Sequence, residues 1–238
     1  MRLCLIGKNI QHSLSPQVHA EIAQKNGRSV DFELVEVDNL REFMCETVWH
    51  YDGVAVTSPY KKEIYKYGDL LSQEVSCLKC SNTVKVNSHR FELYNTDVTG
   101  FQKSFTPFFK KWDRITIVGN GGAAQSVIRA LSNLGVDIWG YSAFSSLEIR
   151  SEFNQEWITE SQVIINCSPV GGPSSPEDSP ISADKFKSCR VAFDLNYIPY
   201  ETGFLRAARL AGVEKRKNGF EMLRIQAEEQ QKIWFDGR

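Results

Sequence analysis

Ile115-Thr116-Ile117-Val118-Gly119-Asn120-Gly121-Gly122-Ala123-Ala124 is the stretch that decides the fold of this chain. Its first four residues have the character of a buried strand, and the residues after the glycines have that of a helix. A Gly-x-Gly-x-x-Ala turn between a strand and a helix is the dinucleotide-binding fingerprint. Gly119 permits the tight turn, Gly121 lets the backbone approach a pyrophosphate, and Ala124 allows the helix to pack closely on the strand. The stretch predicts a Rossmann-like domain.

From Arg114 onward, apolar runs alternate with helical stretches. We expect strands at Ile115–Val118, Val136–Tyr141, Val163–Asn166 and Val191–Asp194, and helices at Ala123–Leu134, Thr202–Ala211 and Phe220–Trp234. Strands that are separated by helices predict a parallel sheet with right-handed crossovers.

The first hundred residues also mix strands with helices. We expect strands at Leu3–Ile6, Asp31–Val37 and Gly53–Thr57, a hairpin of Asn82–Val86 with Arg90–Tyr94, and helices at Pro16–Lys25 (with Ser15 as N-cap), Leu40–Val48 and Lys61–Tyr67. The chain as a whole is therefore predicted to form two α/β domains.

Composition excludes several classes of protein. The 238 residues carry a net charge of -1, which gives no electrostatic argument for binding nucleic acid or an anionic membrane. No stretch approaches the roughly 18 apolar residues that a membrane span needs. The six cysteines form no dense framework and fit free thiols in a reducing cytoplasm. Cys77-Leu78-Lys79-Cys80 has neither a second pair nor a histidine partner, so we expect no metal site.

Polar residues that could carry chemistry cluster before the glycine turn. Lys61 follows a buried strand and a turn at Pro59, and Asp97 lies in the run Asn95-Thr96-Asp97. A lysine in a cleft can act as acid and base, and a neighbouring carboxylate orients its ammonium group. Ser13 and Ser15 precede a helix N-terminus, where hydroxyl donors can hold a carboxylate. This combination indicates an oxidoreductase that acts on a small polar molecule.

The end of the second Rossmann strand normally selects the cofactor, through an acid for NAD or an arginine for NADP. Here the sequence is Trp139-Gly140-Tyr141-Ser142-Ala143-Phe144-Ser145-Ser146, which offers neither. Hydroxyls of Ser142 or Ser145 could contact a phosphate, and Arg150 is a further candidate. The choice between NADP and NAD stays open on these residues.

The order of these motifs resembles the shikimate dehydrogenase family almost from end to end. The matching stretches are His12–Ala20, Gly53–Lys61, Asn82-Thr83, Asn95–Gly100, Gly119–Ala123, Asn166–Gly171, Asp194–Thr202 and Gly219–Ala227. The resemblance implies an N-terminal substrate-binding domain (residues 1–101, plus a C-terminal helix at 220–238 that packs back on it) and a Rossmann-like NADP-binding domain (residues 102–219). It also implies NADPH-dependent reduction of 3-dehydroshikimate to shikimate, in the cytoplasmic pathway to aromatic amino acids.

The resemblance further implies roles for individual residues. Lys61 and Asp97 would be catalytic. The substrate would be bound by Ser13, Ser15, Thr57, Lys61, Asn82, Asp97, Tyr197 and Gln226. The cofactor NADP, with NAD not excluded, would be bound by Gly119, Asn120, Gly121, Gly122, Ala123, Ser142, Leu195 and Gly219. The expected partner is the small-molecule substrate, with no nucleic acid or membrane, and the expected state is a monomer or homodimer.

Two departures from the family pattern bear on specificity. Ala55 stands where the family has an asparagine, which removes one expected hydrogen bond to the substrate. Tyr141-Ser142-Ala143 stands where the family has an arginine-bearing run that grips the NADP phosphate. Three alternatives therefore stay open: a quinate/shikimate dehydrogenase paralogue that uses NAD or another substrate, a non-catalytic metabolite-binding paralogue, and a piece of a larger bifunctional protein.

Overall fold

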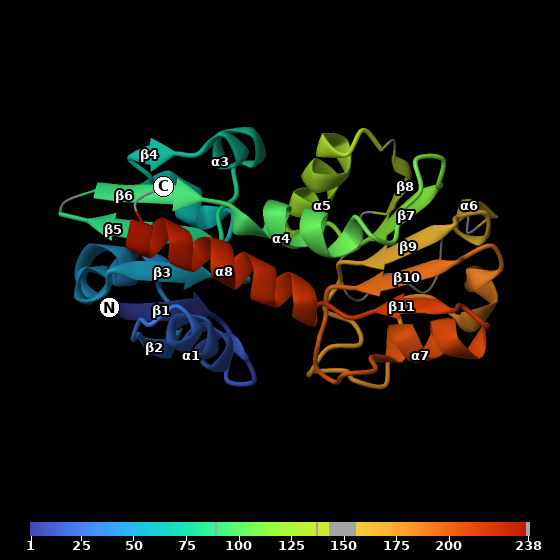
Figure 1. The fold of residues 1–238 in the computed structure, drawn as a ribbon, viewed down its shortest axis with the longest axis horizontal. Coiled ribbons are helices and arrows are strands. Elements are labelled where there is room, and N and C mark those ends of the chain that lie inside the picture. The colour runs from blue at the N-terminus through green and yellow to red at the C-terminus, as the bar shows by residue number, and fades with distance from the viewer. Residues whose placement is uncertain (89, 137, 143–155, 237–238) are drawn as a thin grey trace. The chain divides into compact units, whose positions relative to one another are not determined.

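The computed structural model describes residues 1–88, 90–136, 138–142 and 156–236 (Figure 1). The chain divides into two compact units: Met1–Gly100 with Leu223–Arg238, and Phe101–Met222. The sequence places the boundaries after residue 101 and before residue 220, so the unit borders differ from these by one and three residues. Both borders fall inside helices, which is why composition shows no linker.

The described part of the first unit contains a six-stranded mixed sheet with strand order β2-β1-β3-β5-β6-β4. Strand β1 pairs in parallel with β2 and β3, whereas β5 is antiparallel to β3 and β6. The strands are β1 (Arg2–Gly7), β2 (Asp31–Glu36), β3 (Gly53–Val56), β4 (Leu70–Leu71), β5 (Thr83–Asn87) and β6 (Arg90–Tyr94). The predicted strands and hairpin are confirmed, with β4 in addition.

The helices of the first unit differ more from the predictions. They are α1 (Ser15–Lys25), α2 (Leu40–Glu42), α3 (Gln73–Leu78), the start of α4 (Thr96–Phe105) and most of α8 (Phe220–Asp236). The single helix predicted at 40–48 is wrong: after α2 the chain continues as a π-helical turn (Phe43–Thr47) and a 3-10 turn (Val48–His50). The helix predicted from Lys61 is a 3-10 segment that begins only at Glu63.

Ser15 is not the N-cap of α1, as the sequence suggested, but its first helical residue. Leu14 occupies the cap position and makes no side-chain cap bond. The Ser13 hydroxyl accepts the N–H of Ser15 at 3.2 Å, so it takes over the capping role from two residues upstream.

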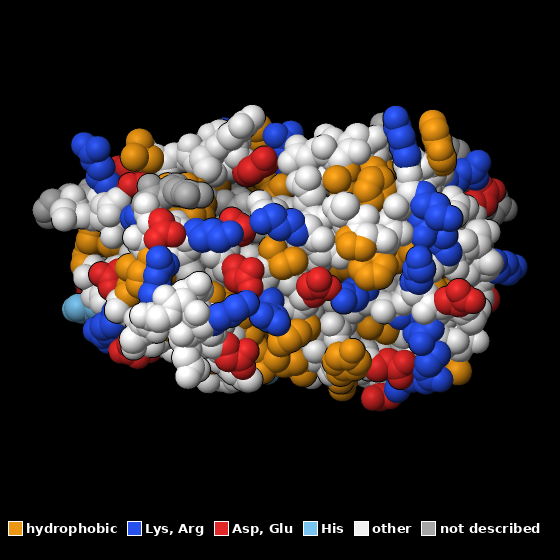
Figure 2. Space-filling view, viewed as in Figure 1, with side chains coloured by type: hydrophobic (Ala, Val, Ile, Leu, Met, Phe, Trp, Pro, Cys, Tyr) orange, Lys and Arg blue, Asp and Glu red, His pale blue; other side chains and the backbone are white. Residues whose placement is uncertain are grey.

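The sheet of the first unit has an apolar layer on each face, because side chains alternate along each strand. Along β1, Cys4 and Ile6 join a large cluster that includes Phe43 and Met44. Leu3 and Leu5 join the opposite cluster, which contains Ala55, Ile233 and Trp234. Helix α8 covers this second face (Figure 1). The helix carries interspersed basic and acidic side chains on its outer side (Figure 2), including the ion pairs Arg224–Glu228 and Lys232–Glu229.

The described part of the second unit contains a five-stranded parallel sheet with strand order β11-β10-β9-β7-β8. Its strands are β7 (Ile115–Val118), β8 (Ile138–Ser142), β9 (Val163–Asn166), β10 (Val191–Asp194) and β11 (Lys215–Lys217), and its helices include α5 (Gly122–Asn133), α6 (Glu156–Thr159) and α7 (Gly203–Leu210). The strand order reverses between β7 and β9, and this is where Rossmann-like folds bind nucleotides. The parallel sheet is confirmed; β11 and α6 were not predicted.

Among the described residues, none of the helices combines the length and the apolar character that crossing a membrane would require. The six cysteines are all free thiols.

Candidate active site

A buried ion pair between Lys61 and Asp97 is the centre of the candidate site. Lys61 Nζ lies 2.7 Å from Asp97 Oδ2, and the two side chains are only 15% and 7% exposed. Charges that are shielded from water in this way interact more strongly than a surface pair. The pair is therefore a fixed feature of the unit rather than a transient surface contact.

The strand directions bring these residues to one edge of the sheet. The parallel strands β1 and β3 both end there, at Gly7 and Val56. Strand β5 begins at this edge and β6 ends at it, because Thr83 at the start of β5 pairs with both Ala55 on β3 and Tyr94 at the end of β6. Lys61 follows β3, Asn82 precedes β5 and Asp97 follows β6, so three segments distant in sequence converge. Asp97 also lies in the first turn of α4, where the helix dipole favours a carboxylate.

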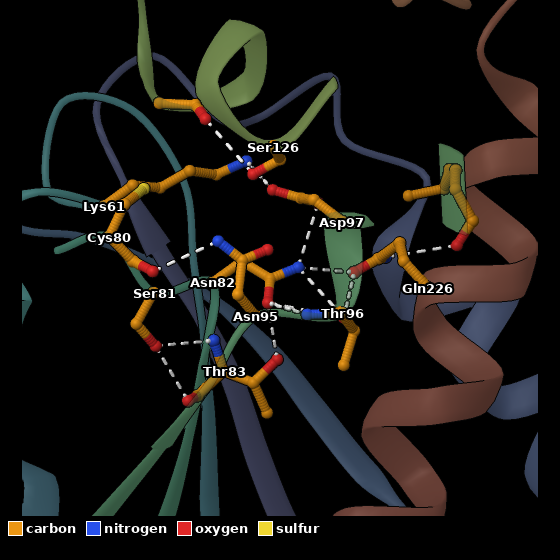
Figure 3. Close-up of polar contacts among 12 residues, drawn as sticks. Lys61, Cys80, Ser81, Asn82, Thr83, Asn95, Thr96, Asp97, Ser126 and Gln226 are labelled. Atoms are coloured by element: carbon orange, nitrogen blue, oxygen red, sulfur yellow. Dashed lines mark hydrogen bonds and ion pairs between the residues drawn. The ribbon is translucent and has the colours of Figure 1, made fainter. Parts of the chain in front are cut away.

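Asn82 links the pair to helix α8 (Figure 3). Its amide nitrogen lies 2.9 Å from Asp97 Oδ1, 3.0 Å from Thr96 Oγ1 and 3.2 Å from Gln226 Oε1. Its amide oxygen accepts hydrogen bonds from the Thr96 N–H and the Thr83 hydroxyl, both at 2.8 Å. With acceptors on one side and donors on the other, the Asn82 amide has a single satisfied orientation. Thr83 and Thr96 were not predicted as site residues, although both lie in matched motifs.

Of the predicted carboxylate-binding hydroxyls, that of Ser13 lies on the loop that follows β1 and that of Ser15 on the first residue of α1. The Ser13 hydroxyl donates to the Ser15 hydroxyl at 3.0 Å, and Ser15 is buried. Thr57 directly follows β3, and its N–H donates to the carbonyl of Ile6 at 2.9 Å. A Cβ on Gly7 would come within 2.5 Å of the Thr57 methyl group, so glycine is needed where the two strand ends meet. Tyr197 lies in the second unit, three residues after β10.

Ala55 lies on β3 beneath α8. It is 4% exposed and belongs to the apolar cluster of Leu3, Leu5, Ile233 and Trp234. The side chain at this position therefore faces hydrocarbon in this protein. An asparagine here would have to find its hydrogen-bond partners inside that cluster.

The glycine turn of the second unit has the geometry of a phosphate-binding loop. Gly119 has a φ of 113°, and a Cβ there would come within 2.9 Å of the backbone of Cys167 and Ser168. The fold itself therefore requires glycine at this position. Gly121 is the N-cap of α5, and a Cβ there would meet no atom within 4 Å. The open space beside Gly121, at the helix N-terminus that Gly122 and Ala123 form, suits a pyrophosphate.

Two further predicted cofactor residues pack against each other after β10 and β11. A Cβ on Gly219 would come within 2.0 Å of the Leu195 carbonyl oxygen, and the Gly219 N–H donates to the Asn196 carbonyl at 3.0 Å. Ser142 is the last residue of β8. Ser145 and Arg150 lie outside the described residues.

A buried polar network supports this edge of the second sheet. Asp194 is fully buried and accepts hydrogen bonds from the Thr202 hydroxyl at 2.5 Å and from Asn166 Nδ2 at 3.1 Å. Asn196 adds its N–H and its Nδ2, both at 2.9 Å. Burial raises the pKa of the Asp194 carboxyl to about 7, against the opposing effect of these donors. Asn166 also holds Ser168, so the network fixes the loops beside Gly119 and Gly219.

Comparisons with known proteins agree with this architecture. The family model described as the shikimate dehydrogenase substrate binding domain matches residues 5–84. A shikimate dehydrogenase (NADP(+)) of Caldicellulosiruptor saccharolyticus is 33% identical over 258 aligned positions, covering 99% of this chain and 92% of the relative. One from Ignicoccus hospitalis is 31% identical, covering 98% and 93%.

A solved structure is similar over the same length. The crystal structure of shikimate 5-dehydrogenase from Thermus thermophilus, in complex with NADP(H) and shikimate, has a TM-score of 0.87 at 27% identity. It aligns with 99% of this chain and 94% of that chain. By sequence and by structure, the chain belongs to the shikimate dehydrogenase family.

Proposed function

We propose that the protein catalyses the NADP-dependent interconversion of 3-dehydroshikimate and shikimate. The observation that carries the proposal is the buried Lys61–Asp97 pair, held by Asn82 at the converging ends of β1, β3 and β6. Relatives that are named shikimate dehydrogenase (NADP(+)), and a similar structure that contains NADP(H) and shikimate, support it. The protein would then act in the synthesis of aromatic amino acids, in the cytoplasm, as a monomer or homodimer.

The residues of the second unit fit a dinucleotide cofactor. The open space at Gly121 and the amides at the start of α5 suit its pyrophosphate. Gly119 to Ala123 would hold that group, while Leu195, Gly219 and Ser142 would lie along the rest of the cofactor. When bound, NADPH supplies the hydride that reduces the substrate carbonyl carbon.

The first unit supplies the proton and the orientation. Lys61 would donate a proton from Nζ to the carbonyl oxygen as the carbon is reduced, and would remove it from the hydroxyl in the reverse direction. Asp97 accepts a hydrogen bond from Lys61 through Oδ2, which fixes the direction of the ammonium group. Asn82 holds the other carboxylate oxygen of Asp97, so the pair cannot rotate away from the substrate.

The remaining predicted residues would bind the substrate. The hydroxyls of Ser13 and Ser15 are 3.0 Å apart and near the start of α1, where both could donate to one carboxylate. Thr57, Asn82 and Gln226 would bind the ring hydroxyls, because amides and hydroxyls can both donate and accept. The family resemblance assigns Tyr197 to the substrate as well.

An absorbance assay at the nicotinamide band tests this function. Shikimate and quinate are each combined with NADP⁺ and with NAD⁺, and the initial rate of cofactor reduction is measured. We expect the highest kcat/KM with shikimate and NADP⁺. Reduction only with quinate or only with NAD⁺ would reject the proposed specificity, and a folded protein that is inactive in all four combinations would reject catalysis.

A further inference from the structure

His19 is a fully buried histidine of α1 that lies outside the candidate active site. Its ring stacks on Phe32 with centroids 4.3 Å apart and an interplanar angle of 12°, and it is tilted toward Trp234 at 5.4 Å. Burial lowers the pKa of the ring to about 3. His19 is therefore neutral at any pH where the protein would work, and one ring nitrogen carries a proton while the other does not.

The neighbour Gln231 identifies which nitrogen carries the proton. Its amide nitrogen lies 2.7 Å from the carbonyl oxygen of His19 and 3.3 Å from Nδ1 of the same ring. A carbonyl oxygen only accepts, so the nitrogen end of this amide must face His19. An amide nitrogen only donates, so Nδ1 must be the acceptor. The ring proton is therefore on Nε2.

The Gln230 side chain offers a candidate acceptor for the protonated Nε2. Within the described residues, the buried side-chain atoms without a hydrogen-bond partner are His19 Nε2, Gln230 Oε1 and Gln231 Oε1. The Gln230 side chain is close enough to the ring to counteract part of the lowering of its pKa. A small adjustment that joins Nε2–H to Gln230 Oε1 satisfies two of the three atoms, and leaving both buried and unpaired would be costly.

Gln230 continues the chain of hydrogen bonds toward the active site. Its amide nitrogen donates to the carbonyl oxygen of Asn82 and to Thr83 Oγ1, both at 3.0 Å. The Thr83 hydroxyl therefore directs its own proton to Asn82 Oδ1, at 2.8 Å. This leaves Asn82 Nδ2 facing Asp97 (Figure 3). Each group in the series donates forward, so the series adds to the Thr96 N–H bond that orients the Asn82 amide.

We propose that His19 is a positioning residue, which acts through Gln230 and Thr83 to hold Asn82 against the Lys61–Asp97 pair. The proposal rests on the proposed function for its effect on turnover, but its hydrogen-bond arrangement does not depend on that function. His19 touches neither substrate nor cofactor in this role. Loss of its Nε2 donor would leave Gln230 Oε1 buried without a donor, and the shift of the Gln230 side chain that follows would loosen Asn82.

The kinetic test uses His19→Leu, which removes the donor, and His19→Gln, whose amide nitrogen can replace Nε2–H. We expect His19→Leu to lower kcat with shikimate and NADP⁺ by about tenfold or more, as misplacement of catalytic groups does, with KM changed less. His19→Gln should recover most of kcat. Gln230→Leu should lower kcat similarly, and the double variant His19→Leu/Gln230→Leu should be no worse than either single variant.

Lys85→Met is the matched control. Lys85 on β5 donates from Nζ to the carbonyl oxygen of Ile233 on α8 at 3.0 Å, so its loss removes a bond between β5 and α8 that does not lead to Asn82. It should reduce the free energy of unfolding and leave kcat unchanged. If His19→Leu and Gln230→Leu behave like this control, His19 only stabilises the fold and the proposal is overturned.

A second measurement separates this proposal from the proposed function. In ¹⁵N-histidine NMR of the wild-type protein, the His19 resonance, assigned from its loss in His19→Gln, should show a neutral ring with the proton on Nε2. A proton on Nδ1 would overturn the proposal even in an active enzyme. If the wild type is inactive with shikimate, the proposed function fails. A shift of the Asn82 side-chain amide resonance in His19→Leu would then still support the positioning role, and an unshifted resonance would refute it.

Discussion

Replacement of Lys61 should change both turnover and stability, and the buried Lys61–Asp97 pair allows the size of each change to be worked out. Lys61→Met keeps most of the packing of the side chain and removes its charge. Loss of a general acid typically costs about 10²–10⁴-fold in rate. At about 1.4 kcal/mol for each tenfold change, this is about 3–6 kcal/mol of transition-state stabilisation. We therefore expect kcat to fall at least about a hundredfold while shikimate still binds.

The same substitution leaves the Asp97 carboxylate with its charge uncompensated. Breaking a buried ion pair from one side commonly costs about 3–5 kcal/mol. Asn82 Nδ2 remains as a donor to Asp97 at 2.9 Å and Lys61 is 15% exposed, so the lower end, about 3 kcal/mol, applies here. Adding Asp97→Asn to Lys61→Met removes the stranded charge. The double variant should recover more than half of the lost stability and none of the lost turnover.

The assay combines the nicotinamide absorbance rate with urea unfolding and with calorimetric binding of shikimate. Lys62→Met is the control, because Lys62 is the adjacent lysine and its side chain is exposed. It should change neither turnover nor stability. Turnover of Lys61→Met above a tenth of the wild-type value would refute the role of Lys61 as the proton donor. A double variant that is as unstable as Lys61→Met would show that the unpaired charge is not the cause of the instability.

Three further predictions follow from burial and close packing. The pKa of the Asp194 carboxyl is raised to about 7 from 3.8, so between these pH values the folded state binds one proton that the unfolded state has lost. The free energy of unfolding should therefore fall by on the order of 4 kcal/mol through this group as pH rises from 4 to 7. Urea unfolding of Asp194→Asn should lack this fall in stability, and an equal fall in both proteins would disprove the prediction. Gly219→Ala should lower NADP⁺ affinity and the thermal midpoint together, because its Cβ would overlap the Leu195 carbonyl oxygen; calorimetric titration and a melting curve that both match the wild type would contradict the packing. Ala55→Asn should reduce the free energy of unfolding by about 1–3 kcal/mol, because an amide enters the apolar cluster beneath α8; an unchanged denaturation midpoint would mean that the amide finds partners there.

Local patterns were sufficient for the longer strands and for the class of fold, but not for the short strands β4 and β11. The strand–glycine–helix pattern at 115–124 indicated β7, the turn and α5, because each follows from side-chain periodicity and from the conformational freedom of glycine. Helical segments were harder to predict. The stretch 40–50 has helical periodicity. Tertiary packing of Phe43, Met44 and Val48 on the sheet nevertheless favours a π-helical turn followed by a 3-10 turn there.

The candidate residues could be named from motifs, but their connections could not. That Lys61 meets Asp97, and that Asn82 joins them to Gln226 on a helix 144 residues later in the chain, follows from strand order and from the packing of α8 on the first sheet. The connection of His19 to Gln230 could not be predicted either, because the motif that contains His19 indicates only the start of helix α1.

The sequence by itself determined the alternation of elements and the glycine turn, because these depend on residues within a few positions of each other, and its motifs named the candidate site residues. Only the tertiary structure decided which of those side chains are buried, which donor faces which acceptor, and that the Ala55 side chain faces hydrocarbon. These properties depend on contacts between segments that are distant in sequence, where burial removes water as an alternative partner and so leaves each polar group a single satisfied arrangement.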